Sequence, residues 1–336
     1  MQNLKMTRKC NHSLLDKAKY SKKDEFYTQL VDIESELAYY KDYFNGKIVY
    51  CNCDDVKSSN FFKYFVSNFR LLGLKKLISS CYKESNLFNH QSGYYYEYTG
   101  CEKNDVDMSK IKKFKGDGDF RSPECVELLK QADVVVTNPP FSLFRDYISQ
   151  LVQYDKKFLV ISNVNAITYK EVYSLIKDNK LWLGVNLGRG ISGFIVPKEY
   201  ELYGQETKIN EYGERIISPN NCMWLTNINN SKQQEFINLT EKYVGNETRY
   251  PRYDNFNGIH IDKTKNIPVD YDGAMGVPVT FLHKFNPNQF EIIQFRKGDD
   301  GKDLRINGKA PFFRILVKKK TSMSNISKKD LKQLIC

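Results

Sequence analysis

Residues 132–141 read ADVVVTNPPF, and this stretch decides how the rest of the chain is interpreted. Its first part is a compact apolar run rich in valine, which predicts a buried strand. A polar turn follows, and residues 142–151 (SLFRDYISQL) predict a helix after it. A strand, a tight turn and a helix in this order predict an open α/β sheet, in which ligands bind at the carboxyl ends of the strands.

The turn at residues 138–141 (NPPF) has groups suited to a planar ring that carries an exocyclic amine. Asn138 offers an amide oxygen and an amide donor. Pro139 and Pro140 fix the backbone and lack an N–H, so their carbonyl oxygens are acceptors held in place. Phe141 adds a flat apolar face. Asn-Pro is also a common turn former, so the four residues alone are about as consistent with a simple turn.

Strand-like and helix-like segments alternate on both sides of this turn. Strands are expected at residues 47–52 (KIVYCN), 74–82 (LKKLISSCY), 94–98 (YYYEY), 157–163 (KFLVISN) and 181–185 (LWLGV). Helical spacing occupies residues 30–44, 58–72, 122–131 and 168–179. The alternation predicts a doubly wound, mostly parallel α/β sheet. Residues 191–197 (ISGFIVP) and 220–228 (NNCMWLTNI) are expected to be strands that complete it.

Composition narrows the class of protein. The chain has 336 residues, a formal charge of +11 and 14% aromatic residues, which favours a polyanionic partner, nucleic acid before membrane. Many basic proteins bind no polyanion, so the net charge alone is weak evidence for a nucleic-acid partner. No segment is long and apolar enough to span a bilayer, and the N-terminus does not lead into a signal-peptide core. We expect a cytoplasmic protein.

The residues that usually bind metals are dispersed. The eight cysteines do not form a disulfide framework in a chain of this length, and Cys51 and Cys53 are expected to pack in a strand. The four histidines are scattered, and we expect no metal site. The sequence also lacks a G-x-G-x-x-G motif and a P-loop, which argues against a nicotinamide dehydrogenase and a nucleotide triphosphatase.

The C-terminal region has a different character. Residues 230–320 mix basic and aromatic side chains among short strands and loops, which suits phosphate contacts combined with base contacts. The candidate nucleic-acid contacts are Arg249, Arg252, Lys284 and Arg296. A solvated basic face on a β-rich subdomain explains any single one of them equally well. We expect a basic arm at residues 1–20, an α/β ligand-binding domain at 21–229 and a nucleic-acid-binding region at 230–336.

Five runs in this order carry a resemblance: DEFYT, IVYCNCDD, GDF, VVVTNPPF and FLVISN. Together they resemble the S-adenosylmethionine-dependent adenine-N6 DNA methyltransferases, and most closely the EcoRI-type modification methylases. The resemblance implies a Rossmann-like methyltransferase fold and S-adenosylmethionine as cofactor. It implies these cofactor contacts: Phe26, Tyr27, Thr28, Cys51, Asn52, Asp54, Asp119, Phe120 and Asn138.

Some of these roles follow the family pattern more closely than others. Asp119 resembles the residue that accepts a hydrogen bond from the cofactor's adenine amine, and Phe120 resembles the one that packs on its ring. The turn after residues 47–52 departs from the usual glycine-rich form. Residues 80–82 (SCY) stand where an acid ordinarily binds the ribose, and Glu84 comes later.

The resemblance also implies how the catalytic turn works. Asn138 and the Pro139 carbonyl would accept both N–H bonds of an adenine amine, and Phe141 would stack on a base flipped out of duplex DNA. Double-stranded DNA is the expected partner of a monomer, at a short palindrome such as GAATTC, with a cognate restriction endonuclease as a possible genetic companion. Two alternatives stay open: an RNA adenine or protein glutamine methyltransferase, and a catalytically silent DNA-binding module.

Overall fold

The computed structural model describes residues 27–83, 91–100, 107–186, 191–196, 207–210, 212–217, 221–296, 304–310 and 313–320. The expected basic arm, Phe26 and Glu84 lie outside these ranges. The chain divides into two compact units. We call Met1–Val164 with Gly188–Leu225 the first unit, and Asn165–Leu187 with Thr226–Cys336 the second unit.

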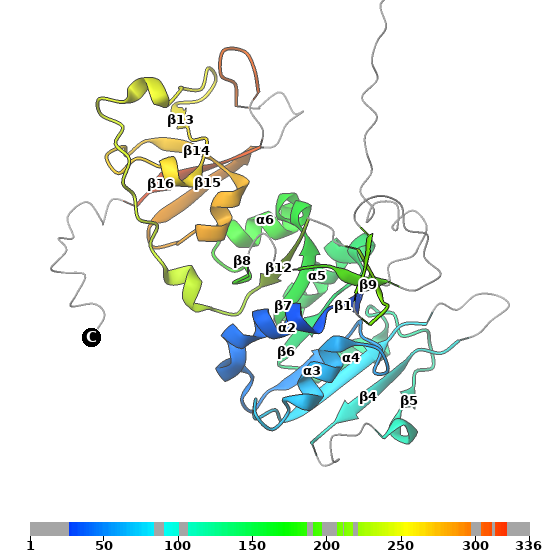
Figure 1. Ribbon diagram of the computed structural model, residues 1–336. Helices are drawn as coiled ribbons and strands as arrows, with labels where there is room; N and C mark the ends of the chain where they lie inside the picture. The colour runs from blue at the N-terminus through cyan, green and yellow to red at the C-terminus, as the bar shows by residue number, and fades with distance from the viewer. Residues whose placement is uncertain are drawn as a thin grey trace, which may run out of the picture. The chain divides into compact units, whose positions relative to one another are not determined.

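A mixed sheet forms the centre of the first unit (Figure 1). Its strands within the first unit are, in spatial order, β5 (Lys112–Lys113), β4 (Tyr94–Tyr98), β3 (Lys76–Cys81), β2 (Ile48–Cys51), β6 (Val134–Thr137), β7 (Lys157–Asn163) and β12 (Cys222–Thr226). The four strands from β3 to β7 are parallel, whereas β4 is antiparallel to β3. Successive strands run outward from β2 in both directions, so the order switches between β2 and β6. Such a switch point is where open α/β sheets bind ligands.

The helices of the first unit begin where the sequence indicated. They are α2 (Leu30–Leu37), η1 (Ala38–Phe44), α3 (Asn60–Ser67), α4 (Pro123–Gln131), η3 (Phe141–Leu143) and α5 (Phe144–Gln153). Ser59 caps α3 and Ser122 caps α4, each accepting a backbone N–H through its hydroxyl. The expected helix at residues 30–44 changes from α to 3₁₀ geometry after Leu37, and it ends before Gly46, whose φ is 72°.

The aromatic stripe of α3 is core, as predicted. Phe61, Phe62 and Phe65 are at most 1% exposed, so each ring contributes roughly 1.5–3 kcal/mol by burial. Phe61 also packs edge-on against Trp224 of β12, with ring centroids 5.9 Å apart. The helix is therefore fixed on the sheet, and its N-terminus lies close to the exit from β2.

One strand prediction is wrong. Residues 191–197 do not extend the main sheet: β9 (Phe194–Val196) pairs antiparallel with β1 (Tyr27–Thr28), beside it in Figure 1. With β11 (Arg215–Ile217) and β10 (Thr207–Ile209) they form a separate sheet in the order β1-β9-β11-β10. Burial explains the difference. In β9 only the side chains of alternate residues are buried, as in a half-exposed antiparallel strand, whereas β12 is buried throughout and does join the main sheet.

The second unit contains a four-stranded sheet in the order β13-β14-β16-β15. Its elements are η4 (Val164–Thr168) at the boundary, α6 (Lys170–Lys177), β8 (Trp182–Leu183), η5 (Ser231–Gln234), η6 (Glu247–Arg249), β13 (Gly258–His260), η7 (Thr264–Asn266), β14 (Ala274–Pro278), η8 (Val279–Lys284), β15 (Phe290–Arg296) and β16 (Arg314–Lys319). The expectation of short strands and loops over residues 230–320 is confirmed where the structure describes that range, at 230–296, 304–310 and 313–320. Among the described helices of both units, none has the length and apolar character to cross a membrane.

Candidate active site

The predicted site residues gather where the parallel strands of the main sheet end, which we call the carboxyl edge. Residues 52–55 leave β2 there, residues 82–83 leave β3, and residues 138–141 leave β6. Because β2 is paired with both β3 and β6, these three exits are neighbours. The sheet therefore brings the NPPF turn (residues 138–141) beside the turn predicted to serve the cofactor.

Asp54 ties these exits together. Its side chain is 8% exposed, and its carboxylate accepts hydrogen bonds from Ser59 Oγ, at 2.6 Å, and from Thr137 Oγ1. Its backbone N–H donates to the Ser80 carbonyl at 3.0 Å, and its carbonyl accepts from Ser79 Oγ at 2.6 Å. Burial raises the pKa of Asp54 to about 6, although the two hydroxyl donors oppose that rise. Both carboxylate oxygens thus accept hydrogen bonds from protein groups. The predicted direct contact of the Asp54 side chain with the cofactor stays a prediction.

Asn52 forms the second link between the two turns. It is 4% exposed, and its Oδ1 accepts a hydrogen bond of 2.6 Å from the hydroxyl of Tyr147, a fully buried residue of α5. Burial holds the pKa of the Tyr147 hydroxyl well above its usual range, so it remains a donor. The helix that follows the NPPF turn is therefore bound to the exit from β2.

The NPPF turn is only partly exposed. Pro139 is buried, and Asn138, Pro140 and Phe141 are half-buried. The Pro140 carbonyl accepts the N–H of Leu143 at 3.1 Å and so begins η3. Within the described parts of the chain, no backbone N–H donates to the Pro139 carbonyl, so this oxygen keeps its capacity to accept a hydrogen bond.

The N-terminal strand β1 joins the site through two contacts. Thr28 pairs with Phe194 of β9, and the ring of Phe194 lies 6.2 Å from that of Phe141. The Thr28 carbonyl accepts a 2.8 Å hydrogen bond from Asn60 Nδ2 at the start of α3. The Thr28 hydroxyl is buried and has no hydrogen-bond partner among the described residues. Because buried hydroxyls usually have a hydrogen-bond partner, this one is consistent with a polar ligand bound beside β1.

Asp119 and Phe120 lie in the loop before α4. Arg121 binds the Asp119 carboxylate in bidentate fashion, Nε to Oδ1 at 2.9 Å and Nη2 to Oδ2 at 2.7 Å, and its hydrogen bonds lower the pKa of Asp119. Phe120 is 5% exposed and packs edge-on against Tyr147, with centroids 5.2 Å apart. The carboxylate is thus held ionised, and its contact with a cofactor amine stays a prediction.

Sequence reasoning missed a charged cluster beside these residues. The Asp55 carboxylate accepts from the Lys57 N–H at 2.9 Å and from the Tyr94 hydroxyl at 2.7 Å, and it pairs with Lys83 at 3.5 Å. Burial opposes ionisation of Asp55, but these donors outweigh it and lower the pKa. The sequence signal was the second acid of the NCDD run, which looked like a plain turn residue.

The cysteines of the β2 exit are not suited to nucleophilic chemistry. Burial raises the pKa values of the Cys51 and Cys53 thiols well above their usual range, so both stay protonated. Within the described ranges, no group of three or more His, Cys, Asp or Glu side chains has a metal-binding arrangement. The site instead offers acceptors and acids for an organic ligand.

The DNA-binding candidates lie in the second unit. Arg249 and Arg252 are exposed; Arg249 pairs with Glu241 at 3.1 Å, and Arg252 donates to the Tyr243 hydroxyl at 3.4 Å. The Tyr243 ring in turn lies 4.7 Å from that of Tyr271. Lys284 is exposed at the end of η8, away from this cluster in sequence, and Arg296 ends β15, its side chain lying outside the described parts. The structure thus joins Arg252 to a pair of tyrosines, whereas Arg249 pairs with a carboxylate.

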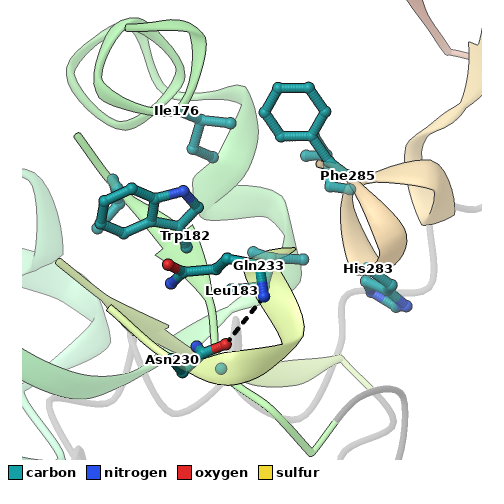
Figure 2. A pocket seen from close by; sticks show the side chains of 10 residues that line it. Ile176, Trp182, Leu183, Asn230, Gln233, His283 and Phe285 are labelled. Atoms are coloured by element: carbon teal, nitrogen blue, oxygen red, sulfur yellow. Dashed lines mark hydrogen bonds between the residues drawn. The ribbon is translucent and has the colours of Figure 1, made fainter. Parts of the chain in front are cut away.

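A pocket in the second unit contains none of the predicted site residues (Figure 2). It is lined by Ile176, Leu181, Trp182, Leu183, Gly184, Asn230, Gln233, Leu282, His283 and Phe285. Burial lowers the pKa of His283, so its imidazole is neutral at pH 7. The lining has no carboxylate, so the pocket lacks the acids that distinguish the carboxyl edge of the first unit.

Comparison with known proteins gives concordant matches. The sequence matches the family described as "Adenine-specific methyltransferase EcoRI" over residues 14–330. It is 61% identical over 322 residues to the Type II methyltransferase M.EcoRI of Escherichia coli, covering 94% of this chain and 99% of that protein. It is 38% identical to the Type II methyltransferase M.MgeORF184P of Mycoplasma genitalium (90% and 98% covered) and 34% identical to M.MpnI of Mycoplasma pneumoniae (92% and 98%). No solved structure matches the chain.

Proposed function

This chain belongs to the EcoRI family of adenine-specific methyltransferases, and on that premise we propose that residues 138–141 hold the amine that receives the methyl group. The chain is a DNA adenine methyltransferase of the Type II restriction-modification class. The observation that carries the proposal is the position of the NPPF turn. It lies at the switch point of the sheet, joined to the exit from β2 through Asp54 and Thr137.

S-adenosylmethionine is the proposed methyl donor. When bound, it supplies an electrophilic methyl group on a positively charged sulfur. The carboxyl edge suits such a cation because Asp54, Asp55 and Asp119 all lie there, and Asp55 and Asp119 have lowered pKa values. The buried Thr28 hydroxyl adds a polar contact that the described protein does not satisfy. We propose that Thr28 and Asp119 bind the cofactor directly and that Asn52 and Asp54 shape its site.

The NPPF turn would position the acceptor. An adenine amino nitrogen is a poor nucleophile because its lone pair is delocalised into the ring. Hydrogen bonds to the Asn138 side chain and the Pro139 carbonyl would engage both N–H groups and favour a tetrahedral nitrogen. Phe141, packed against Phe194, would stack on the base. Positioning and electrostatics then supply the rate, without a covalent enzyme intermediate.

Duplex DNA imposes one further requirement. The amine lies inside the helix, so the target adenine must be rotated out of the stack, at a cost of a few kcal/mol. We propose that the second unit binds the duplex through Arg249, Arg252 and their tyrosine neighbours, and that the enzyme acts as a monomer. The resemblance suggests GAATTC as the first DNA sequence to test.

The experiment supplies the protein with methyl-labelled S-adenosylmethionine and separate pools of DNA, RNA and protein. We expect label in DNA alone, recovered as N6-methyladenine after nuclease digestion and mass spectrometry. A duplex with GAATTC and a scrambled duplex then test sequence dependence. Label in RNA or protein glutamine instead of DNA would overturn the proposed substrate, and cofactor binding without transfer to any pool would indicate a silent binding module.

A variant pair tests the site in the same assay. Asn138→Ala should bind DNA normally but lose methyl transfer by at least about 100-fold, the scale of removing one preorganised catalytic hydrogen bond. Asn68→Ala is the matched control, because Asn68 caps the C-terminus of α3, the end opposite Ser59, through its bond to the Tyr64 carbonyl. Similar turnover in the two variants would exclude residues 138–141 as the acceptor site.

A further inference from the structure

We propose that the exit from β2 grips the NPPF turn from both flanks, with Asp54 binding Thr137 on one side and Asn52 binding Tyr147 on the other. These four are positioning residues, which set the geometry of the turn and need not touch the substrate. The proposal rests on the function proposed above, because it assumes that the NPPF turn holds the amine. We call the two hydrogen bonds the clamp.

The bond on the first flank fixes the residue immediately before Asn138. Thr137 is fully buried, and its hydroxyl donates to Asp54 Oδ2 across 83 positions of sequence. Asp54 is itself fixed, since Ser59 binds its other carboxylate oxygen and β3 binds its backbone. Pro139 restricts the backbone of Asn138. Little freedom remains between the fixed side chain of Thr137 and the fixed ring of Pro139, so the backbone from which the Asn138 side chain extends is held in place.

The bond on the second flank fixes the helix that follows the turn. Tyr147 lies one turn into α5, and its hydroxyl donates to Asn52 Oδ1 at 2.6 Å across 95 positions of sequence. Its ring also receives the edge of Phe120, the neighbour of Asp119. One buried tyrosine therefore joins the catalytic turn, the β2 exit and the loop proposed to bind the cofactor.

The chemistry of the clamp argues against a purely structural role. Buried charged or polar partners are seldom more stabilising than well-packed apolar ones, so a buried carboxylate is a costly way to join two strands. Its advantage is a fixed direction. Methyl transfer needs the amine in line with the methyl group, and a misplacement of about 1 Å can cost on the order of 100-fold in rate. The clamp therefore fixes the position of the NPPF turn relative to the exit from β2, which is predicted to serve the cofactor.

The test uses single hydrogen-bond deletions in the full-length enzyme. Thr137→Val and Tyr147→Phe each remove a hydroxyl with little change of shape, and each should lower kcat by about 10- to 100-fold while KM for DNA changes less than about 3-fold. Thr137→Ser restores the hydroxyl and should recover most of the rate. Tyr40→Phe is the matched control: Tyr40 is buried in η1, and its hydroxyl donates to the buried carboxylate of Glu36, four residues earlier, rather than to the exit from β2.

The outcomes separate the clamp from the function on which it rests. If Tyr147→Phe and Thr137→Val turn over as fast as Tyr40→Phe, the clamp is wrong even though Asn138→Ala is inactive. If all three slow equally and melt at equally lowered temperatures, the bonds are ordinary core contacts and the clamp is again wrong. If Asn138→Ala itself keeps its turnover, the proposed function fails first. Because the two bonds are removed by separate substitutions, a folding failure of one variant leaves the other variant to decide.

Discussion

Replacing Asp54 with asparagine should stabilise the first unit in neutral solution and slow the enzyme. Asp54 is buried, and its pKa is raised from 3.8 to about 6. That difference corresponds to about 3 kcal/mol, at about 1.4 kcal/mol for each tenfold change in the ionisation equilibrium. Asparagine has nearly the same shape and does not ionise. It avoids this cost but makes weaker hydrogen bonds to Ser59 and Thr137, which removes about 1 kcal/mol of the gain.

The expected pH dependence follows from the direction of the shift. The folded protein binds a proton on Asp54 more tightly than the unfolded chain does. The contribution of this proton to the free energy of unfolding is therefore fully present below pH 3.8, and it is lost as the pH rises through about 6. Relative to the wild type, Asp54→Asn should be more stable by about 2 kcal/mol at pH 8, and this advantage should fall to near zero by pH 4.

Tryptophan fluorescence during urea unfolding can measure this difference in the first unit alone. The chain has two tryptophans: Trp224 is fully buried in the first unit, and Trp182 belongs to the second. In a Trp182→Phe background, the signal reports on Trp224. A stability difference that is the same at pH 4 and pH 8, or a loss of stability at pH 8, would refute the reasoning. The expected loss of turnover in the same variant would show that the carboxylate is retained for function at the expense of stability.

Two further predictions concern the cofactor and the DNA. Thr28→Val, which removes a buried hydroxyl without a partner in the described chain, should weaken S-adenosylmethionine binding about 5- to 10-fold by calorimetry, the scale of one hydrogen bond, and should leave DNA affinity unchanged. An unchanged cofactor affinity would remove Thr28 from the site. Arg252→Ala should weaken binding to specific and scrambled duplexes alike and reduce the slope of log K against log salt by about 1; a slope equal to the wild type's would contradict a phosphate contact.

The sequence predicted the elements that depend on local pattern. The valine run of β6, the capping serines of α3 and α4, and the stop at Gly46 all act within a few residues, so their signals are readable in a single chain. The NPPF turn was also placed correctly at a strand end, because parallel strands with helical connections all present their exits at one edge.

What the sequence could not indicate are the contacts between distant segments. The pairing of β1 with β9 joins short strands whose local pattern carries no information on register, so residues 191–197 were placed in the wrong sheet. Tyr147 lies in a segment predicted only to be helical, and the fold places its hydroxyl at Asn52. The bond of Asp54 to Thr137 spans 83 positions, so no local pattern could indicate it.

The central claim is that the NPPF turn holds the amine during methyl transfer. Its most direct test is single-turnover methylation of a cognate duplex by Asn138→Ala, with S-adenosylmethionine and DNA both saturating and their dissociation constants measured on the same preparation. We predict a methyl-transfer rate at least about 100-fold below that of the wild type, with both dissociation constants within about 3-fold of it. A rate near that of the wild type in the fully bound complex would contradict the claim.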